Sequence, residues 1–304
     1  MTCRPYAIYD VFTTHALSGN PLAVVFDAAG LSGEAMQAIA REFNLSETVF
    51  VLKPENELHN AAVRIFMPGG ELPFAGHPTV GAAIAIAERE GRLDNGAALV
   101  ALEETIGLVR AAVRRDGEGV FAEFDLPKLP EHLPNPVAKE AAAAALGINV
   151  HEIGFENHMI SAWSAGVPYV CVPVRNLDVA QRVRMNDALW LSALGDPAPY
   201  GAPCPYVYCR ETVNHDSAFH VRMFAGIHGI PEDPATGSAA AAFAGAVVHF
   251  DEPSIGLHRL VLEQGIEMGR PSRIQLEIEV EHATLLAARI GGHAVKVAEG
   301  MLHL

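Results

Sequence analysis

Two short glycine-containing turns, each followed by an apolar segment of helix length, are the first candidates for chemistry in this sequence. The first is Ala75-Gly76-His77-Pro78-Thr79 and the second is Ala235-Thr236-Gly237-Ser238. The N-terminus of a helix has backbone N–H groups without intrahelical partners and carries the positive end of the helix dipole, so it attracts anions. Two such turns would suit a small carboxylate. The simpler alternative is that both are ordinary helix starts.

Three titratable side chains, two of them at or near these turns, could transfer protons. Glu47 precedes the apolar run 49–52, and desolvation at the mouth of a buried strand would make it a stronger base. His77 opens the first apolar segment, where the helix dipole disfavours a protonated imidazole. Asp233 lies in a turn before Pro234. From position alone, a solvated loop glutamate, a structural histidine and an aspartate in ordinary turn chemistry are the alternatives.

The two turns belong to a pattern that occurs twice along the chain. Three sequence pairs recur in the same order: Gly19-Asn20-Pro21 with Gly166-Val167-Pro168, Val63–Phe66 with Val221–Phe224, and Glu71-x-Pro73-x-x-Gly76 with Glu232-x-Pro234-x-x-Gly237. Three repeated segments in the same order indicate a duplicated domain. Each copy leads into an apolar helix, at 79–89 with Pro78 as its first residue and at 239–248. A helix that is apolar on all sides is buried, so we expect strands to surround each one.

The remaining segments predict the fold class. Short runs rich in Val, Ile and Phe predominate in both halves and do not alternate regularly with helices. The pattern predicts an α+β fold of two similar domains, each a curved sheet or barrel around its apolar helix, at about 1–118 and 119–291. The stretch 127–136 has four prolines in ten residues and is expected to be a linker without helix or central strand. Ser32 is the expected N-cap of an amphipathic helix.

Composition excludes several classes of partner. The 304 residues include 36 Asp and Glu against 21 Lys and Arg, a net charge of −15. A chain so acidic does not attract nucleic-acid phosphates or anionic lipid, so neither nucleic acid nor membrane is an expected partner. No apolar stretch reaches the ~18–20 residues needed to span a bilayer, and the first residues do not resemble a signal peptide. These features predict a cytoplasmic protein.

Metal and thiol chemistry are also not expected. The four cysteines (Cys3, Cys171, Cys204 and Cys209) are too few for a disulfide scaffold and lack zinc-site spacing. None of them lies at either repeated turn, which argues against a racemase that uses thiols. The fourteen histidines form no recognised ligand pattern, and neither a P-loop nor a dinucleotide-binding glycine motif is present. We therefore predict no bound metal.

Five segments together resemble the PhzF family, the phenazine-biosynthesis-type isomerases within the diaminopimelate epimerase-like superfamily. They are Gly19–Val25, Arg41–Thr48, Glu71–Thr79, Gly229–Ala240, and Gln264-Gly265 with Gly269–Ser272. The resemblance implies two similar domains with the active site in the cleft between them, and a final strand, about 292–304, that returns to the first domain. It also implies cofactor-free catalysis and, commonly, a homodimer.

The resemblance further implies an activity. In the phenazine enzyme the substrate is trans-2,3-dihydro-3-hydroxyanthranilate, from which a glutamate removes a ring proton and returns it at another carbon. Glu47 matches that glutamate, and His77 and Asp233 match residues that assist proton handling and hold the polar groups of the substrate. Four further positions match residues that surround or bind the substrate: Ser46, Gly76, Gly237 and Ser238.

Two departures leave the native substrate open. Met67-Pro68-Gly69-Gly70 and Ala225-Gly226-Ile227-His228 both differ from the pattern of the phenazine enzyme near the expected cleft. The two catalytic cysteines of the epimerases have no counterpart, since Ala75 and Pro234 lie near those positions. An isomerase with one carboxylate base is thus the leading hypothesis. The alternatives are an amino-acid epimerase or racemase and a non-catalytic protein that binds an acidic metabolite.

Overall fold

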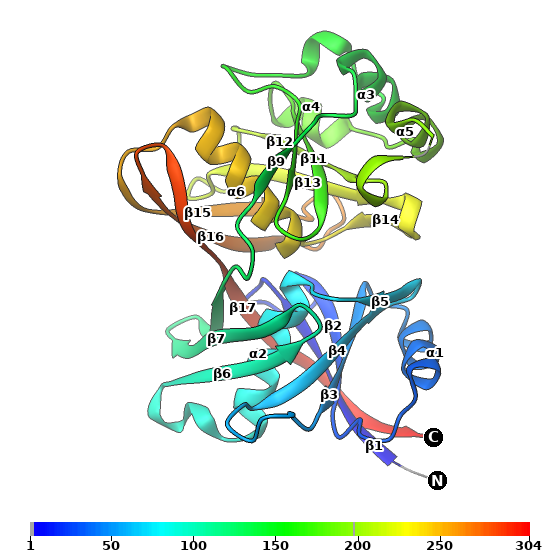
Figure 1. The fold of residues 1–304 in the computed structure, drawn as a ribbon, viewed down its shortest axis with the longest axis vertical. Helices are drawn as coiled ribbons and strands as arrows, with labels where there is room; N and C mark the ends of the chain where they lie inside the picture. The colour runs from blue at the N-terminus through cyan, green and yellow to red at the C-terminus, as the bar shows by residue number, and fades with distance from the viewer. Residues whose placement is uncertain (1–2, 197) are drawn as a thin grey trace. The chain divides into compact units, whose positions relative to one another are not determined.

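The chain forms two compact units in the computed structural model, which describes residues 3–196 and 198–304 (Figure 1). Unit 1 comprises Met1–Pro127 with Ile290–Leu304, and unit 2 comprises Lys128–Arg289. The expected boundary after residue 118 lies one strand earlier than this division. The reason is that β8 (Gly119–Asp125) pairs along its whole length with β7 (Gly107–Asp116) of unit 1.

Unit 1 is a closed barrel. Its other strands are β1 (Cys3–Val11), β2 (Asn20–Val25), β3 (Glu47–Leu52), β4 (Ala61–Met67), β6 (Ala97–Glu104) and the second part of β17 (Thr284–His303). Pairing runs β1–β2–β3–β4–β6–β7–β8–β17 and returns from β17 to β1, with β2–β3 and β4–β6 parallel. The short β5 (Gly70–Leu72) pairs with β4, and η1 (Arg92–Asn95) precedes β6.

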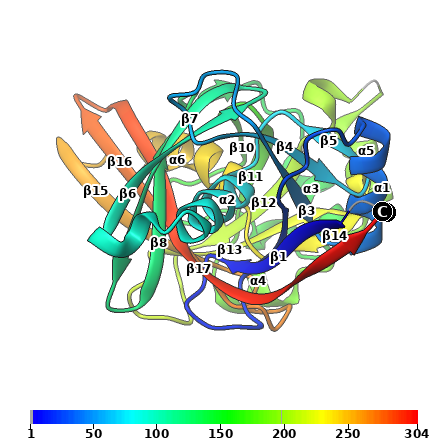
Figure 2. The same cartoon turned by 90° about the horizontal axis from the view of Figure 1, so that it is seen from below.

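The helix α2 (Gly76–Arg89) fills this barrel, and Figure 2 shows it with strands around it. Its residues from Gly76 to Ala87 are all buried, as its apolar sequence predicts. Strands approach it closely, since a Cβ atom on Gly81 would lie 2.5 Å from Leu22 Cδ2. The helix begins at Gly76, two residues before the expected first residue, so Pro78 is its third residue. Proline is tolerated there because N–H groups in the first turn have no intrahelical partner.

The helix α1 (Gly33–Phe43) packs outside the barrel and behaves as its sequence predicts. Ser32 is the N-cap, and its hydroxyl accepts a hydrogen bond from the Ala35 N–H at 3.1 Å. Asn44 ends the helix in the left-handed conformation, at φ 51°. The buried face of α1 contacts β3 and β4, which places the following residues, 46 and 47, at the start of β3.

Unit 2 repeats the strand order of unit 1. Its strands are β9 (Glu131–Leu133), β10 (Ser161–Ser164), β11 (Pro168–Pro173), β12 (Cys204–Cys209), β13 (Phe219–Ala225), β14 (Ile230–Asp233), β15 (Gly256–Gln264) and β16 (Ser272–Glu281). Pairing runs β9–β10–β11–β12–β13–β15–β16, with β11–β12 and β13–β15 parallel and β14 beside β13. From β10 to β16 these are the directions found for β1–β2–β3–β4–β6–β7, so the duplication is structural as well as sequential.

The helix α6 (Gly237–Asp251) is the counterpart of α2 and is likewise apolar and largely buried. It packs on β10, β11 and β16, and Gly245 allows close contact with Trp163. The α+β prediction of two similar domains around apolar helices is thus confirmed. The proline-rich stretch 127–136 has neither a helix nor a central strand, as expected, but its proline-free residues Glu131–Leu133 form the short strand β9, which pairs with β10.

Further helices cover the outer face of the unit 2 sheet and are grouped together at one end of unit 2 in Figure 1. They are α3 (Lys139–Leu146), η2 (Val150–Glu152), α4 (Leu177–Arg182), α5 (Asp187–Leu194), η3 (Pro199–Gly201) and η4 (Gly226–His228). Between these helices and the sheet lies a second apolar core of unit 2, in which Trp190 of α5 is fully buried. Among the described residues, no helix has the length and apolar character needed to cross a membrane.

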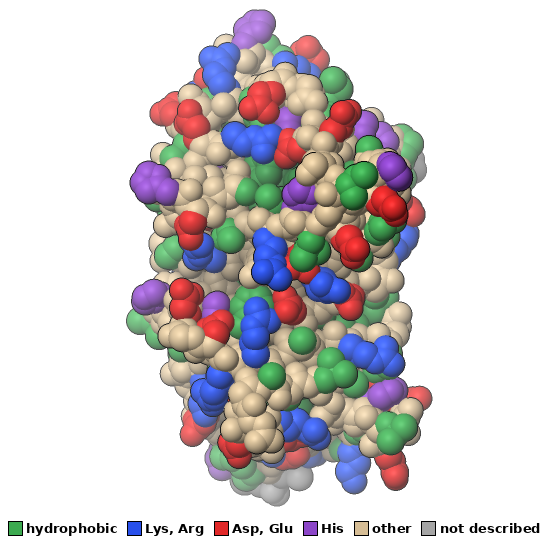
Figure 3. Space-filling model, turned by 90° about the vertical axis from the view of Figure 1, so that its left-hand side faces the viewer, with side chains coloured by type: hydrophobic (Ala, Val, Ile, Leu, Met, Phe, Trp, Pro, Cys, Tyr) green, Lys and Arg blue, Asp and Glu red, His purple; other side chains and the backbone are tan. Residues whose placement is uncertain are grey.

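The surface carries mixed charge. On the face drawn in Figure 3, acidic and basic side chains lie interspersed over both units. Among the side chains drawn there, the basic ones do not form the continuous positive stripe that is typical of proteins that bind phosphate backbones.

Candidate active site

The first turn of α2 brings together two of the predicted catalytic residues. Glu47 is the first residue of β3, and His77 is the second residue of α2. His77 Nε2 lies 3.3 Å from Glu47 Oε2, and the side chains are 3% and 14% exposed, respectively. A carboxylate and an imidazole thus face each other in a nearly dry environment, although they are 30 residues apart in the sequence.

Asn20 determines which nitrogen of His77 carries the proton. It is the first residue of β2, it is fully buried, and its Nδ2 lies 3.3 Å from His77 Nδ1. An amide nitrogen can only donate, so Nδ1 accepts and the proton of a neutral imidazole resides on Nε2. Burial lowers the pKa of His77 to about 3, so the ring is neutral at physiological pH. The N–H of the neutral ring is therefore on the nitrogen that lies 3.3 Å from Glu47 Oε2.

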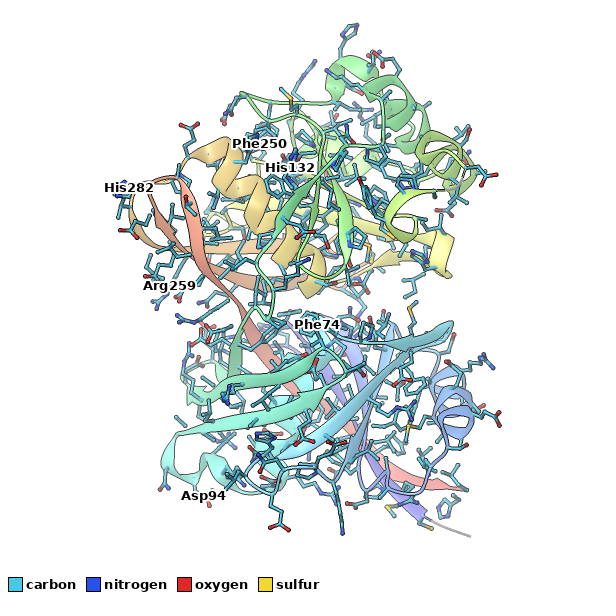
Figure 4. The ribbon with its side chains drawn as sticks, viewed as in Figure 1. Phe74, Asp94, His132, Phe250, Arg259 and His282 are labelled. Atoms are coloured by element: carbon cyan, nitrogen blue, oxygen red, sulfur yellow. The ribbon has the colours of Figure 1, made fainter. Side chains whose placement is uncertain are left out.

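The neighbouring residues complete this half of the site. Ser46 is partly buried in the loop that leads into β3, directly before Glu47. Gly76 is the first residue of α2, where backbone N–H groups have no intrahelical partner. Phe74, labelled in Figure 4, lies between β5 and α2 and packs against Phe124 of β8, with ring centroids 5.7 Å apart. This contact fixes the segment that enters the helix.

The first turn of α6 carries the other predicted residues. Asp233 is the last residue of β14, it is buried, and its Oδ2 accepts a hydrogen bond of 2.6 Å from Thr236 Oγ1. Gln264 supports the same turn: its Nε2 donates to Asp233 O at 2.7 Å and its Oε1 accepts from Thr236 N at 3.1 Å. The turn is therefore rigidly held before α6 begins.

Gly237 and Ser238 are the first two residues of α6. The Ser238 hydroxyl lies 2.8 Å from the phenol oxygen of Tyr169 on β11, so its orientation is fixed by a side chain from a neighbouring strand. Each unit thus has a polar cluster at the N-terminus of its central helix. That the two clusters act on one substrate molecule stays a prediction.

Sequence analysis did not assign three residues that support these clusters: Asn20, Gln264 and Tyr169. Asn20 and Gln264 stand within segments on which the family resemblance rests, so a signal was present, but their contacts bridge 57 and 28 residues and depend on the fold. Tyr169 follows the second copy of the Gly-x-Pro repeat, where the first copy has Leu22. Nothing in the sequence distinguishes its phenol from a core aromatic ring.

None of the four cysteines belongs to the segments that start α2 and α6. Cys171, Cys204 and Cys209 are buried in β11 and β12, and burial raises the pKa of Cys204 and of Cys209 to about 12. Cys3 is exposed on β1, beside His303 of β17. The raised pKa values keep the Cys204 and Cys209 thiols protonated at neutral pH. Over residues 3–196 and 198–304, no three His, Cys, Asp or Glu side chains are grouped as metal ligands.

Residues 9–300 match the family of phenazine biosynthesis-like proteins. The chain belongs to this family. It is 60% identical to an uncharacterized isomerase of Mesorhizobium japonicum, with both chains covered completely. It is 33% identical to the trans-2,3-dihydro-3-hydroxyanthranilate isomerase of Pseudomonas aeruginosa, with 98% of this chain and 99% of that one covered. The resemblance predicted from the motifs is therefore confirmed.

The fold agrees with this assignment. A crystal structure of a PhzF-family phenazine biosynthesis protein from Bacillus anthracis superposes with a TM-score of 0.88 at 29% identity, and the match covers both chains completely. Several full-length relatives are named isomerases, and this family member is accordingly an isomerase.

Proposed function

We propose that this isomerase moves a proton from one carbon to another within a small carboxylate-bearing substrate, with Glu47 as the base and without a metal or organic cofactor. The observation that carries the proposal is the approach of His77 Nε2 to Glu47 Oε2 at 3.3 Å, beside an imidazole that burial keeps neutral. A carboxylate in so dry an environment is a suitable general base, and contacts of this length commonly tighten when substrate binds.

The proposed reaction needs only this chain and its substrate. Glu47 takes a proton from a substrate carbon and becomes a carboxylic acid, while the electron pair of the broken C–H bond moves into the conjugated system of the substrate. The same acid returns its proton at another carbon, which gives an isomer and restores the carboxylate. The N–H groups at the start of α2, including that of Gly76, would stabilise the negative charge that develops in between.

We propose that Asp233, Gly237 and Ser238 bind the polar groups of the same substrate molecule. Asp233 would accept hydrogen bonds from an ammonium or hydroxyl group, and the α6 N-terminus would accommodate a carboxylate. The relative from Pseudomonas aeruginosa is named for trans-2,3-dihydro-3-hydroxyanthranilate, a carboxylate that carries both kinds of donor group. The Met67–Gly70 segment differs from the sequence pattern of the phenazine enzyme. We therefore propose the chemical class of the native substrate and not this particular compound.

Thiol-based racemisation is not favoured by the structure of either unit. It requires two cysteines that flank one carbon atom. Cys171 and Cys204 are instead buried in neighbouring strands, where burial raises the pKa of both thiols. Ala75 and Pro234, which lie near the positions of the two epimerase cysteines, cannot transfer protons.

An assay in D2O tests the proposal. Wild type, Glu47→Gln and the exposed control Glu42→Gln are incubated with trans-2,3-dihydro-3-hydroxyanthranilate, and deuterium placement is followed by NMR. We expect turnover with incorporation in wild type and control, and a loss of about 100-fold or more in Glu47→Gln. Full activity of Glu47→Gln would exclude this base. If wild type is inactive, a panel of small carboxylates follows, and binding without proton exchange would indicate a non-catalytic protein.

A further inference from the structure

A buried carboxyl group lies beneath the first turn of α2 and has no part in the mechanism above. Glu104 is the last residue of β6 and is 7% exposed. Its Oε1 lies 2.8 Å from the Thr79 hydroxyl, and that hydroxyl lies 2.8 Å from the carbonyl oxygen of Ala75, the residue before α2. Three oxygen atoms therefore form a chain from the strand to the helix start.

The number of protons shared by these three oxygen atoms determines whether the Glu104 side chain is protonated. The Ala75 carbonyl can only accept, and the Thr79 hydroxyl has one proton to donate. If Thr79 donates to Ala75, then Glu104 must itself donate to Thr79, and it can do so only as a carboxylic acid. If Thr79 donated to a Glu104 carboxylate instead, two oxygen lone pairs would face each other at 2.8 Å.

Burial independently favours the acid form. Desolvation raises the pKa of Glu104 to about 8, against a smaller opposing effect of the Thr79 hydrogen bond. Its second oxygen, Oε2, is buried and has no hydrogen-bond partner among the described residues. Burying a charged carboxylate oxygen without a hydrogen-bond partner costs much more free energy than burying the carbonyl oxygen of a neutral acid in the same way.

The second unit has an amide at the equivalent position. Glu103 of β6 pairs with Ala62 of β4, and Glu263 of β15 pairs with His220 of β13, so Glu104 and Gln264 occupy matching places in the duplicated sheet. Gln264 hydrogen-bonds to the residues that start α6, through Thr236 and Asp233. A neutral donor thus supports the start of the central helix in both units.

We propose that Glu104 is a positioning residue of the isomerase, a neutral acid that holds the Ala75 carbonyl through Thr79. In a trans peptide the C=O and the following N–H point in opposite directions. Fixing the Ala75 carbonyl toward Thr79 therefore directs the Gly76 N–H away from the helix, toward the proposed anion site, and fixes the backbone that carries His77. This inference rests on the proposed function of Glu47 and His77.

Paired substitutions separate this role from simple packing. Glu104→Gln retains a donor to Thr79, and Glu104→Met has similar size without one. Thr79→Ser retains the hydroxyl, and Thr79→Val removes it at nearly equal volume. Glu103→Gln is the matched control, because Glu103 is the neighbouring residue on β6 and bonds to the loop N–H groups of Glu55 and Asn56 instead.

In the deuterium assay we expect Glu104→Met and Thr79→Val to lower kcat by about tenfold or more, with Glu104→Gln and Thr79→Ser within about threefold of wild type. The double variant Glu104→Met with Thr79→Val should be no worse than the poorer single variant, because both break one chain of bonds. A purely structural role would lower the melting temperature of both Glu104 variants and leave kcat of the folded enzymes unchanged, which would overturn the proposal.

A second readout does not depend on the substrate. The ¹⁵N signals of the His77 ring report its tautomer and surroundings in the free protein. We expect them to be preserved in Glu104→Gln and shifted in Glu104→Met and Thr79→Val. If the wild type is inactive but the His77 signals shift in Glu104→Met and Thr79→Val, the proposed substrate is rejected and the positioning role is supported. Unchanged His77 signals in both disruptive variants would overturn the role of Glu104, whatever the activity.

Discussion

Two buried histidines in this chain show how neighbouring residues decide the charge of a side chain. His77 faces the Asn20 amide on one side, and burial lowers its pKa to about 3. Burial alone would also lower the pKa of His220, but hydrogen bonds to Glu263 and Glu267 raise it to about 9. One ring is therefore neutral and suited to hydrogen bonding at the site, and the other is a fixed cation within its unit.

The role of Asn20 can be tested by changing one atom of its side chain. In Asn20→Asp a carboxylate replaces the amide donor, so it favours a protonated His77 and raises its pKa. In wild type, the ¹⁵N signals of His77 should stay those of the neutral ring with its proton on Nε2 between pH 8 and pH 5. In Asn20→Asp the ring should gain its second proton within that range, and turnover should fall by about tenfold or more.

The control for this experiment is Asn135→Asp, which changes a side chain that bonds to the backbone of Val137 in unit 2. It should leave the His77 signals unchanged. If Asn20→Asp also leaves them unchanged, Asn20 does not set the protonation state of His77.

At the scale of helices and strands, the sequence predicts best where a single periodic signal dominates. Ser32 caps α1 as expected, and the apolar helices α2 and α6 are buried in their sheets. The helix α3 was not predicted, although five of its eight residues are alanine, because an alanine run shows no contrast between polar and apolar faces and its N-cap, Ala138, makes no side-chain hydrogen bond. Its position depends on packing against α5, which local sequence does not encode.

The residues of the site likewise divide into those that sequence motifs predict and those that only the structure identifies. Glu47 and His77 could be assigned because each lies in a recognisable motif. Asn20 and Glu104 contact the same helix turn from two other strands, and these contacts exist only once the barrel has closed around α2. Their roles follow from strand pairing over long sequence separations and therefore required the structure.

The tight fit around the central helices predicts a stability effect at Gly245. A Cβ atom there would lie 2.3 Å from Trp163 Cε3, a rigid ring atom in a buried strand. Gly245→Ala should therefore lower the free energy of unfolding by about 1–3 kcal/mol, although alanine is the better helix former. Urea denaturation measures the change. Gly117→Ala is the control, because nothing lies within 4 Å of a Cβ atom there, and an equal stability in both variants would contradict the packing argument.

On the scale of the whole chain, the two units are not two consecutive segments. The C-terminal residues 290–304 leave unit 2 and complete the barrel of unit 1, where β17 pairs with β1 on one side and with β8 on the other. In unit 2 the strand β9 takes the corresponding place beside β10. The first barrel can therefore close only after residues 290–304 have been synthesised.

This connectivity predicts a selective effect of truncation. Removing residues 290–304 leaves β1 and β8 as unpaired edges and exposes the helix α2 to water. Hydrogen exchange should then lose its protection in β1, β8 and α2, while β12 and β13 of unit 2 keep theirs, since none of their pairing involves the deleted residues. Removal of Leu304 alone, which lies outside β17, is the control. Retained protection of β1 in the truncated chain would mean that barrel closure does not stabilise unit 1, and equal loss in both units would mean that they fold as one cooperative body.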